Sequence, residues 1–153
     1  MEKLVEKGFF ADKDLNCAET ILHAANEVHG WNLSHDALLL STGFGGGVGG
    51  QELLCGALTG GVMALGKLFV RDRGHESDRI KTITKDYFGL FEKEMGHIDC
   101  SPLKEAHRTE TEGCRKVILA SARALDKIVE KYRNEIASGA GMEEETYCLE
   151  DSE

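Results

Sequence analysis

The sequence predicts an all-α fold, a compact bundle of about five to seven helices. In each apolar stretch, hydrophobic residues recur at helical spacing, and no stretch alternates as a strand does. The 153-residue chain contains 18 glycines and a single proline, a composition typical of helices joined by glycine-built corners. This length forms one domain that can bury a core. We expect a helical domain over residues 1–137 and an acidic, flexible tail over residues 138–153.

Three helices are expected before the glycine tract, over residues 2–10, 17–29 and 35–40. Leucine, valine and phenylalanine at helical spacing predict the first. Asn16 and Glu19 form a capping box at the start of the second, and Gly30 ends it. Ser34 is the expected cap of the third.

A fourth helix is expected from about residue 52 to residue 69, after the glycine tract at 43–50. Gly56, Gly60 and Ala64 recur every four residues and form a stripe on one of its faces. Glycine inside a helix costs about 1 kcal/mol relative to alanine, so the stripe indicates close approach by another helix or by a cofactor. Tight core packing without a ligand explains it equally well. Together with Gly61, the stripe also predicts a homodimer.

The last three helices are expected over residues 78–95, 102–106 and 112–136. Gly96 ends the first of them. Ser101 and Pro102 have the pattern of an N-cap followed by proline at the first helical position. A long apolar-periodic run defines the final helix.

Charge and hydropathy exclude two classes of partner. Of the net charge of −9, six negative charges and no positive ones fall in residues 138–153. Neither the tail nor the nearly balanced body offers the basic patch that nucleic acid requires. No apolar run approaches the roughly 20 residues that span a bilayer, and the N-terminus lacks the core of a signal peptide. We therefore expect no membrane insertion and a cytoplasmic location.

Four of the five cysteines lie within a residue or two of an expected helix start: Cys17, Cys55, Cys100 and Cys114. Unpaired N–H groups and the helix dipole favour the thiolate there, the form that binds metals or attacks disulfides. No CxxC motif is present, so only the tertiary fold can gather these thiols. Cys148 lies in the tail and is expected to be exposed and to take no part in the site. Each thiol, taken singly, could also be a buried core residue.

Glycines around these cysteines are candidates for cofactor binding: Gly45, Gly46, Gly47 and Gly56. The tract lacks the Gly-Lys-Ser/Thr ending of a P-loop, which argues against phosphate binding. We expect instead that it lets backbone N–H groups approach sulfur, as anion-binding nests do. His97, three residues before Cys100, is the candidate for an additional ligand, although a loop histidine is more often structural.

The order of these motifs resembles the redox-active protein family labelled C-GCAxxG-C-C. The resemblance covers about residues 8 to 133, and the following segments carry it: Asn16-Cys17-Ala18, Gly43 to Gly47, Cys55 to Gly60, Cys100 and Cys114. It implies four hallmark cysteines, Cys17, Cys55, Cys100 and Cys114, and a redox function. Cys148 lies outside the pattern.

Three functions follow as hypotheses. The first is a small electron-transfer protein whose four cysteines hold an iron–sulfur cluster, most plausibly [2Fe–2S], serving a redox partner as a component of an oxidoreductase. In the second, the same cysteines act without metal as redox thiols in disulfide exchange. The third is a module that binds zinc or another soft metal. We place Cys55 at the centre of the site with a depressed pKa, because glycines leave its sulfur open to backbone donors.

Overall fold

The computed structural model describes residues 1–8 and 13–133, and helices account for most of them. Their bounds are α1 (Glu2–Glu6), α2 (Cys17–His29), α3 (His35–Leu39), the 3₁₀ turn η2 (Thr42–Phe44), α4 (Gly56–Phe69), α5 (Arg79–Met95), α6 (Cys100–His107) and α7 (Arg115–Lys131). Within these ranges β pairing is limited to two isolated bridges, Leu54 with Asp99 and Thr109 with Gly113. The seven α-helices of the described part confirm the predicted all-α bundle. The tail over 138–153 and Cys148 lie outside the described residues.

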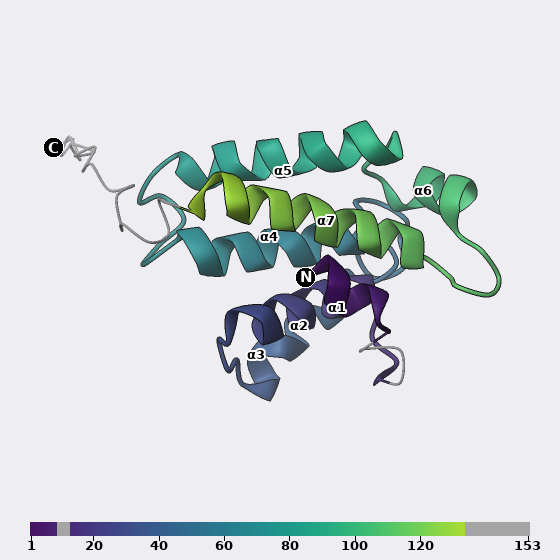
Figure 1. Cartoon of the computed structure of the whole chain (residues 1–153), viewed down its shortest axis with the longest axis horizontal. Helices are drawn as coiled ribbons and strands as arrows, with labels where there is room; N and C mark the ends of the chain where they lie inside the picture. The colour runs from purple at the N-terminus through teal and green to yellow at the C-terminus, as the bar shows by residue number, and fades with distance from the viewer. Residues whose placement is uncertain (9–12, 134–153) are drawn as a thin grey trace, which may run out of the picture.

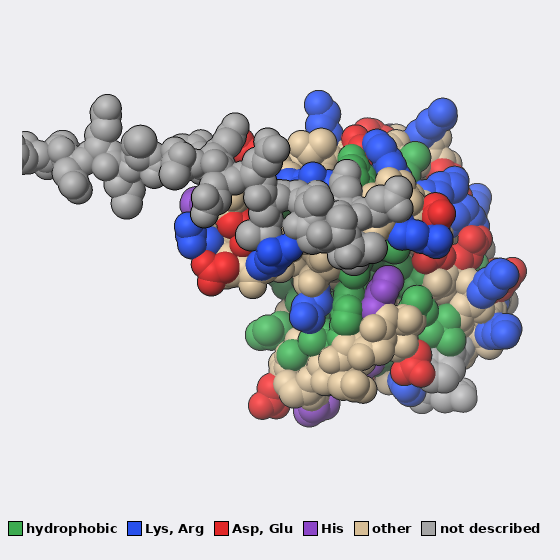
Figure 2. Space-filling view, turned by 60° about the vertical axis from the view of Figure 1, so that its left-hand side comes forward, with side chains coloured by type: hydrophobic (Ala, Val, Ile, Leu, Met, Phe, Trp, Pro, Cys, Tyr) green, Lys and Arg blue, Asp and Glu red, His purple; other side chains and the backbone are tan. Residues whose placement is uncertain are grey.

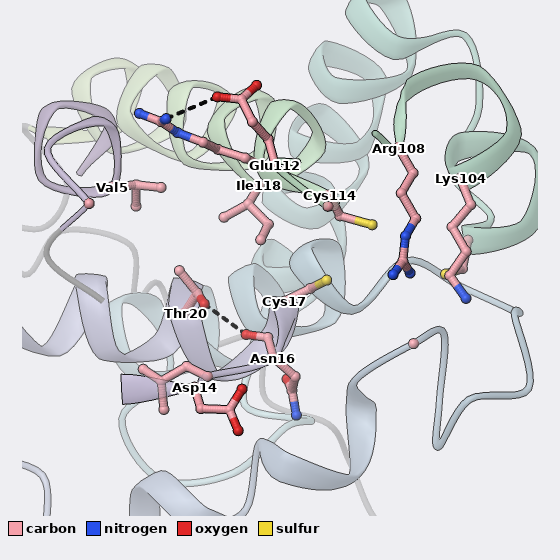
Figure 3. A pocket seen from close by; sticks show the side chains of 16 residues that line it. Val5, Asp14, Asn16, Cys17, Thr20, Lys104, Arg108, Glu112, Cys114 and Ile118 are labelled. Carbon is pink, nitrogen blue, oxygen red and sulfur yellow. Dashed lines mark hydrogen bonds and ion pairs between the residues drawn. The ribbon is translucent and has the colours of Figure 1, made fainter. Parts of the chain in front are cut away.

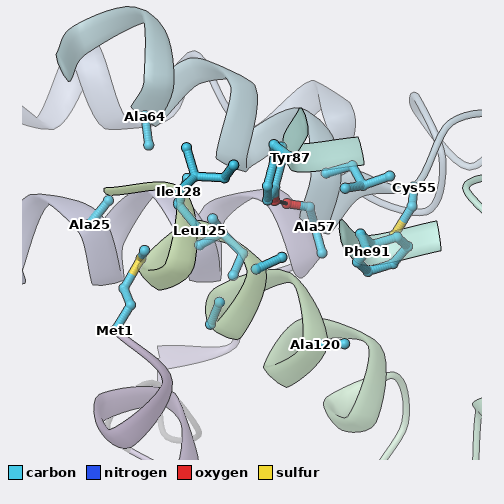
Figure 4. Packing of buried hydrophobic residues seen from close by; sticks show 14 of the residues in the cluster. Met1, Ala25, Cys55, Ala57, Ala64, Tyr87, Phe91, Ala120, Leu125 and Ile128 are labelled. Atoms are coloured by element: carbon cyan, nitrogen blue, oxygen red, sulfur yellow. Dashed lines mark hydrogen bonds between the residues drawn. The ribbon is translucent and has the colours of Figure 1, made fainter. Parts of the chain in front are cut away.

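The long helices α4, α5 and α7 run alongside one another, and α1, α2 and α3 lie below them in Figure 1. Helix α6 sits beyond one end of this layer, near the start of α7. The core lies where α2, α4, α5 and α7 meet (Figure 4). Its largest fully buried apolar side chains on these helices are Ile21, Leu58, Leu65, Ile83, Tyr87, Phe91, Leu125 and Ile128.

Local signals account for several helix ends. Asn16 Oδ1 accepts hydrogen bonds from the N–H groups of Ala18 and Glu19, at 3.0 and 3.1 Å, and Glu19 Oε2 accepts one from Asn16 N–H at 3.0 Å. The predicted capping box is therefore confirmed. Gly30 and Gly96 end α2 and α5 with φ of 60° and 82°, a left-handed conformation that glycine adopts without strain.

Helix α4 begins at Gly56, four residues later than predicted. The preceding segment is held in an extended link to the chain before α6: Leu54 forms a β-bridge with Asp99, and Cys55 N–H donates to the Ile98 carbonyl at 3.0 Å. These backbone bonds are incompatible with an early start of the helix.

Three further expectations are corrected. Helix α6 begins at Cys100 with Asp99 as its N-cap, so Pro102 is not its first residue. Helix α7 spans Arg115–Lys131, shorter than predicted at its start. The apolar pattern of residues 17–29 predicts Val28 on the inner face of α2, but Val28 is 47% exposed and the buried residues of that helix end at Ala25.

The small-residue stripe of α4 packs inside the chain. A methyl group at Gly60 would lie 2.5 Å from the Ala18 carbonyl oxygen of α2, and one at Gly61 would lie 2.1 Å from the Tyr87 hydroxyl of α5. Gly56, Gly60, Gly61 and Ala64 are all buried. The stripe thus allows α2 and α5 to approach α4, and it is not the exposed surface from which a homodimer was predicted.

On the surface, acidic and basic side chains are interspersed over the face shown in Figure 2. None of the helices within residues 1–8 and 13–133 combines the length and apolar character that crossing a bilayer requires.

Candidate functional site

All four hallmark cysteines begin helices, as predicted. Cys17 and Cys100 are the first residues of α2 and α6, and Cys55 and Cys114 are the N-caps of α4 and α7. All four are free thiols. Each of these thiols therefore lies at the positive end of a helix dipole.

Backbone pairing and close packing bring these helix starts together. Cys55 N–H donates to the Ile98 carbonyl at 3.0 Å, and Cys100 N–H donates to the Leu53 carbonyl at 2.6 Å. A methyl group at Gly56 would lie 3.4 Å from Cys17 Cβ, which shows how closely α2 approaches the start of α4. Residues remote in sequence thus share one site.

A pocket of about 480 Å³ opens beside three of the four thiols. Cys17, Cys100 and Cys114 line it (Figure 3). Cys55 does not, since it is only 4% exposed and belongs to the hydrophobic core, at the end that also holds Phe91 (Figure 4). The structure therefore divides the cysteines into a pocket group and a core residue.

Within the pocket, Cys17 and Cys114 shift each other's pKa in opposite directions. The Cys17 thiol lies within reach to donate toward the Cys114 sulfur, and this lowers the pKa of Cys114 to about 6. Burial opposes the effect, while the positive charges of Arg108 and Lys104 add to it. Donation to Cys114, together with burial, raises the pKa of Cys17 above its ordinary range. The pair thus combines a stabilised thiolate with a thiol that keeps its proton.

Cys55 behaves in the opposite way from what was predicted. Burial raises its pKa to about 11, although the backbone N–H groups of Ala57 and Leu58 work against the rise. The expectation of a depressed pKa is wrong because desolvation in the core outweighs the two amide donors of the helix start. A functional role for Cys55 stays a prediction.

The chain matches, over residues 15–128, the family described as "Putative redox-active protein (C_GCAxxG_C_C)". It belongs to this family. No curated protein and no solved structure matches it. The family's redox character agrees with free thiols that share a pocket, while its description names no cofactor.

Two cations of the pocket were missed in the sequence. Lys104 and Arg108 line the pocket, and the charge of each lowers the pKa of Cys114. Lys104 Nζ is held by Glu52 Oε1 at 2.7 Å. The sequence carried part of this signal, because a spacing of four places Cys100 and Lys104 on one side of α6, and Arg108 follows as the C-cap of that helix.

The glycines proposed for cofactor binding pack against the cysteine segments. A methyl group at Gly45 would lie 2.6 Å from Asn16 Cγ, and one at Gly47 would lie 2.6 Å from Cys100 Cβ. At Gly56 it would lie 2.8 Å from the Phe44 carbonyl oxygen, and Gly46 lines the pocket. These positions let the loop approach the thiols closely. Binding of a cofactor by them stays a prediction.

The side chains that could bind a metal do not cluster in the described residues. Among residues 1–8 and 13–133, no three histidine, cysteine, aspartate or glutamate side chains are gathered closely enough to hold a metal ion. His97, the predicted additional ligand, is exposed and does not line the pocket. As they lie, these side chains do not form a site for a single metal ion.

Proposed function

We propose that this protein is a thiol–disulfide redox protein in which Cys114 and Cys17 are the exchanging pair. The observation that carries the proposal is that Cys17 and Cys114 line the same open pocket, where the Cys17 thiol favours the Cys114 thiolate. Thiol exchange needs a thiolate that can be reached and a second thiol close behind it. Cys114 and Cys17 meet these two requirements.

The reaction follows from the two protonation states. The Cys114 thiolate attacks one sulfur of a substrate disulfide, forms a mixed disulfide and releases one substrate thiolate. Cys17 then loses its proton to that leaving thiolate and attacks the Cys114 sulfur. The Cys17–Cys114 disulfide forms and the second substrate sulfur leaves as a thiolate, so that two electrons and the Cys17 proton have passed from protein to substrate. The charges of Arg108 and Lys104 favour the thiolate that begins the sequence.

Mapping of the oxidised protein tests this function. After incubation with a disulfide such as dithiodiglycol, we expect peptide mass spectrometry to find a Cys17–Cys114 crosslink. Cys17→Ala should stop at a mixed disulfide on Cys114, and Cys114→Ser should form neither product. Cys148→Ser serves as the matched control and should behave as the unmodified protein. Exchange that persists without Cys114 would overturn the proposal.

An iron–sulfur cluster, [2Fe–2S], held by Cys17, Cys55, Cys100 and Cys114 is the second candidate. It is supported by the electrostatic effect of the other three thiols on Cys17, which raises the pKa of Cys17. Backbone N–H groups at helix starts are suitable donors to cluster sulfur. The visible spectrum of anaerobically purified protein, with iron and sulfide assays, tests this candidate, and zinc analysis tests a zinc site.

In either form we infer that the protein works with a redox partner protein in the cytoplasm, as a component of an oxidoreductase system. The wide spacing of the cysteines and the lack of a CxxC motif do not indicate a structural disulfide framework, which supports a reducing compartment. Sedimentation at micromolar concentration tests the proposed homodimer, which would need a face other than the buried stripe of α4.

A further inference from the structure

We propose that the pocket beside Cys17 and Cys114 takes small aliphatic disulfides that carry a carboxylate, and that Arg108 binds this carboxylate. The inference rests on the proposed exchange function and names its substrate class. Two observations support it. Arg108 has no hydrogen-bond or ion-pair partner among the described residues, and part of the pocket wall is apolar.

Three cations line the pocket, and two of them have partners in the chain. Lys104 pairs with Glu52 at 2.7 Å. Arg115 pairs with Glu112 at 3.2 Å and donates to the Glu6 carbonyl at 2.6 Å. The Arg108 guanidinium makes no hydrogen bond or ion pair with the residues that the structure describes. Its five N–H donors are therefore available to a ligand, and their planar fork suits a carboxylate.

The position of Arg108 agrees with this role. In Figure 3 its guanidinium lies on the side toward which the Cys114 sulfur points, beside the Lys104 side chain. Of the described acidic side chains that line the pocket, Glu112 is engaged by Arg115, and Asp14 lies on the far side of Asn16 in the same view. Glu52 outside the pocket acts on Arg108 only through its charge, and its carboxylate is engaged by Lys104. An anion at Arg108 would therefore lie close to the attacking sulfur.

The remaining wall and the size of the pocket limit the ligand. Val5, Leu15 and Ile118 provide apolar contact for a short aliphatic chain. A volume of about 480 Å³ lies within the usual range for small-molecule sites, roughly 300–1,000 Å³. Dithiodipropionate has the required parts: a central disulfide, short methylene arms and terminal carboxylates. Its reaction with the protein dithiol yields two mercaptopropionate thiols and the Cys17–Cys114 disulfide, so that atoms and electrons balance.

A charge series of disulfides tests the role of Arg108. Rates of exchange are measured with dithiodipropionate, neutral dithiodiglycol and cationic cystamine, each divided by the rate with a free cysteine peptide. We expect the anionic disulfide to react fastest. Arg108→Gln should lower the ratio of anionic to neutral rates by roughly fivefold, the order expected of a partly exposed charge-assisted hydrogen bond. The ratio removes any change in the reactivity of Cys114 itself.

Two control variants sharpen the result. Arg73→Gln removes a side chain that is 72% exposed and does not line the pocket, and it should leave the ratio unchanged. Arg108→Lys should restore part of the ratio, because it keeps the charge and loses the fork. An unchanged ratio in Arg108→Gln, or an equal loss in Arg73→Gln, would overturn the inference.

A binding measurement separates this inference from the exchange function. Suberate has the length and charges of dithiodipropionate without its disulfide. In NMR titrations of the full chain, we expect suberate to shift signals of pocket residues, and Arg108→Gln to weaken the binding roughly fivefold. Suberate binding without disulfide exchange would refute the exchange function and retain the anion site. Exchange with no suberate binding and no charge preference would refute the anion site alone.

Discussion

Cys55 and Cys114 occupy the same position in their helices and have opposite properties. Both are N-caps, of α4 and of α7, and both are near the positive end of a helix dipole. The pKa of Cys55 is raised to about 11, whereas that of Cys114 is lowered to about 6. The difference lies in what surrounds the sulfur: apolar core at Cys55, and a thiol donor with two cations at Cys114.

A position at a helix start therefore has only a weak influence on the pKa of a cysteine. The amides of Ala57 and Leu58 favour a thiolate at Cys55, and burial outweighs them. At Cys114 burial is also unfavourable, but the Cys17 thiol, Arg108 and Lys104 overcome it. Tertiary neighbours therefore decide which of two similar caps is reactive.

The largest expected effect is a difference in alkylation between these two thiols. At pH 7 a thiol of pKa about 6 is mostly thiolate, and one of pKa about 11 is thiolate in roughly one molecule in ten thousand. The weaker nucleophilicity of the low-pKa thiolate offsets about half of this gap on a logarithmic scale. We expect iodoacetamide to label Cys114 at least about a hundredfold faster than Cys55, as followed by peptide mass spectrometry. Faster labelling of Cys55 would contradict the comparison.

Gly60→Ala tests whether the close packing of α2 on α4 maintains the different surroundings of Cys55 and Cys114. The added methyl group would lie 2.5 Å from the backbone oxygen of Ala18, so α2, which begins with Cys17, must move away from α4. We expect the free energy of unfolding in urea to fall by about 2 kcal/mol or more, and the labelling difference between Cys55 and Cys114 to shrink. Gly66→Ala on the same helix is the matched control. It has no atom within 4 Å of the new methyl group and should gain up to about 1 kcal/mol. Equal behaviour of the two variants would refute the packing argument.

Removing the Cys17 thiol, which favours the Cys114 thiolate, should raise the pKa of Cys114 toward that of Cys55. In Cys17→Ala we expect the pKa of Cys114 to rise from about 6 by roughly one unit or more. Cys17→Ser retains a hydroxyl donor and should produce a smaller rise. The rate of iodoacetamide labelling as a function of pH gives both values. A pKa of Cys114 that stays near 6 in Cys17→Ala would assign the shift to Arg108 and Lys104 instead.

The smallest expected effect concerns the pH dependence of stability. The pKa of Cys114 in the folded protein lies below that of the unfolded chain, so between about pH 6 and the ordinary thiol range the unfolded chain binds more protons. Across this window the free energy of unfolding should rise with pH, relative to Cys114→Ser, and the contribution should be lost as pH falls through 6. We expect a total below about 1 kcal/mol because the sulfur is partly exposed to solvent. Urea titrations of both proteins at several pH values measure it, and a difference that falls with rising pH would contradict the sign.

Local features of the sequence determined the helices and most of their ends. The Asn16–Glu19 capping box and the left-handed glycines at Gly30 and Gly96 act over a few residues, so their effect could be predicted without the fold. The same is true of the four thiols at helix starts. The start of α4 could not be predicted in this way, because the bridge between Leu54 and Asp99 joins segments distant in sequence.

The packing of the helices determines which thiols lie close together and which one is buried. Cys17 and Cys114 begin helices near opposite ends of the chain, and their contact depends on how α2 and α7 pack on α4. Cys55 belongs to the hydrophobic core at the start of α4 and is only 4% exposed. A thiol pKa depends on desolvation and on charges and donors within a few ångströms. Distances of that kind are set by the packing of the helices, and no local pattern in the sequence contains them.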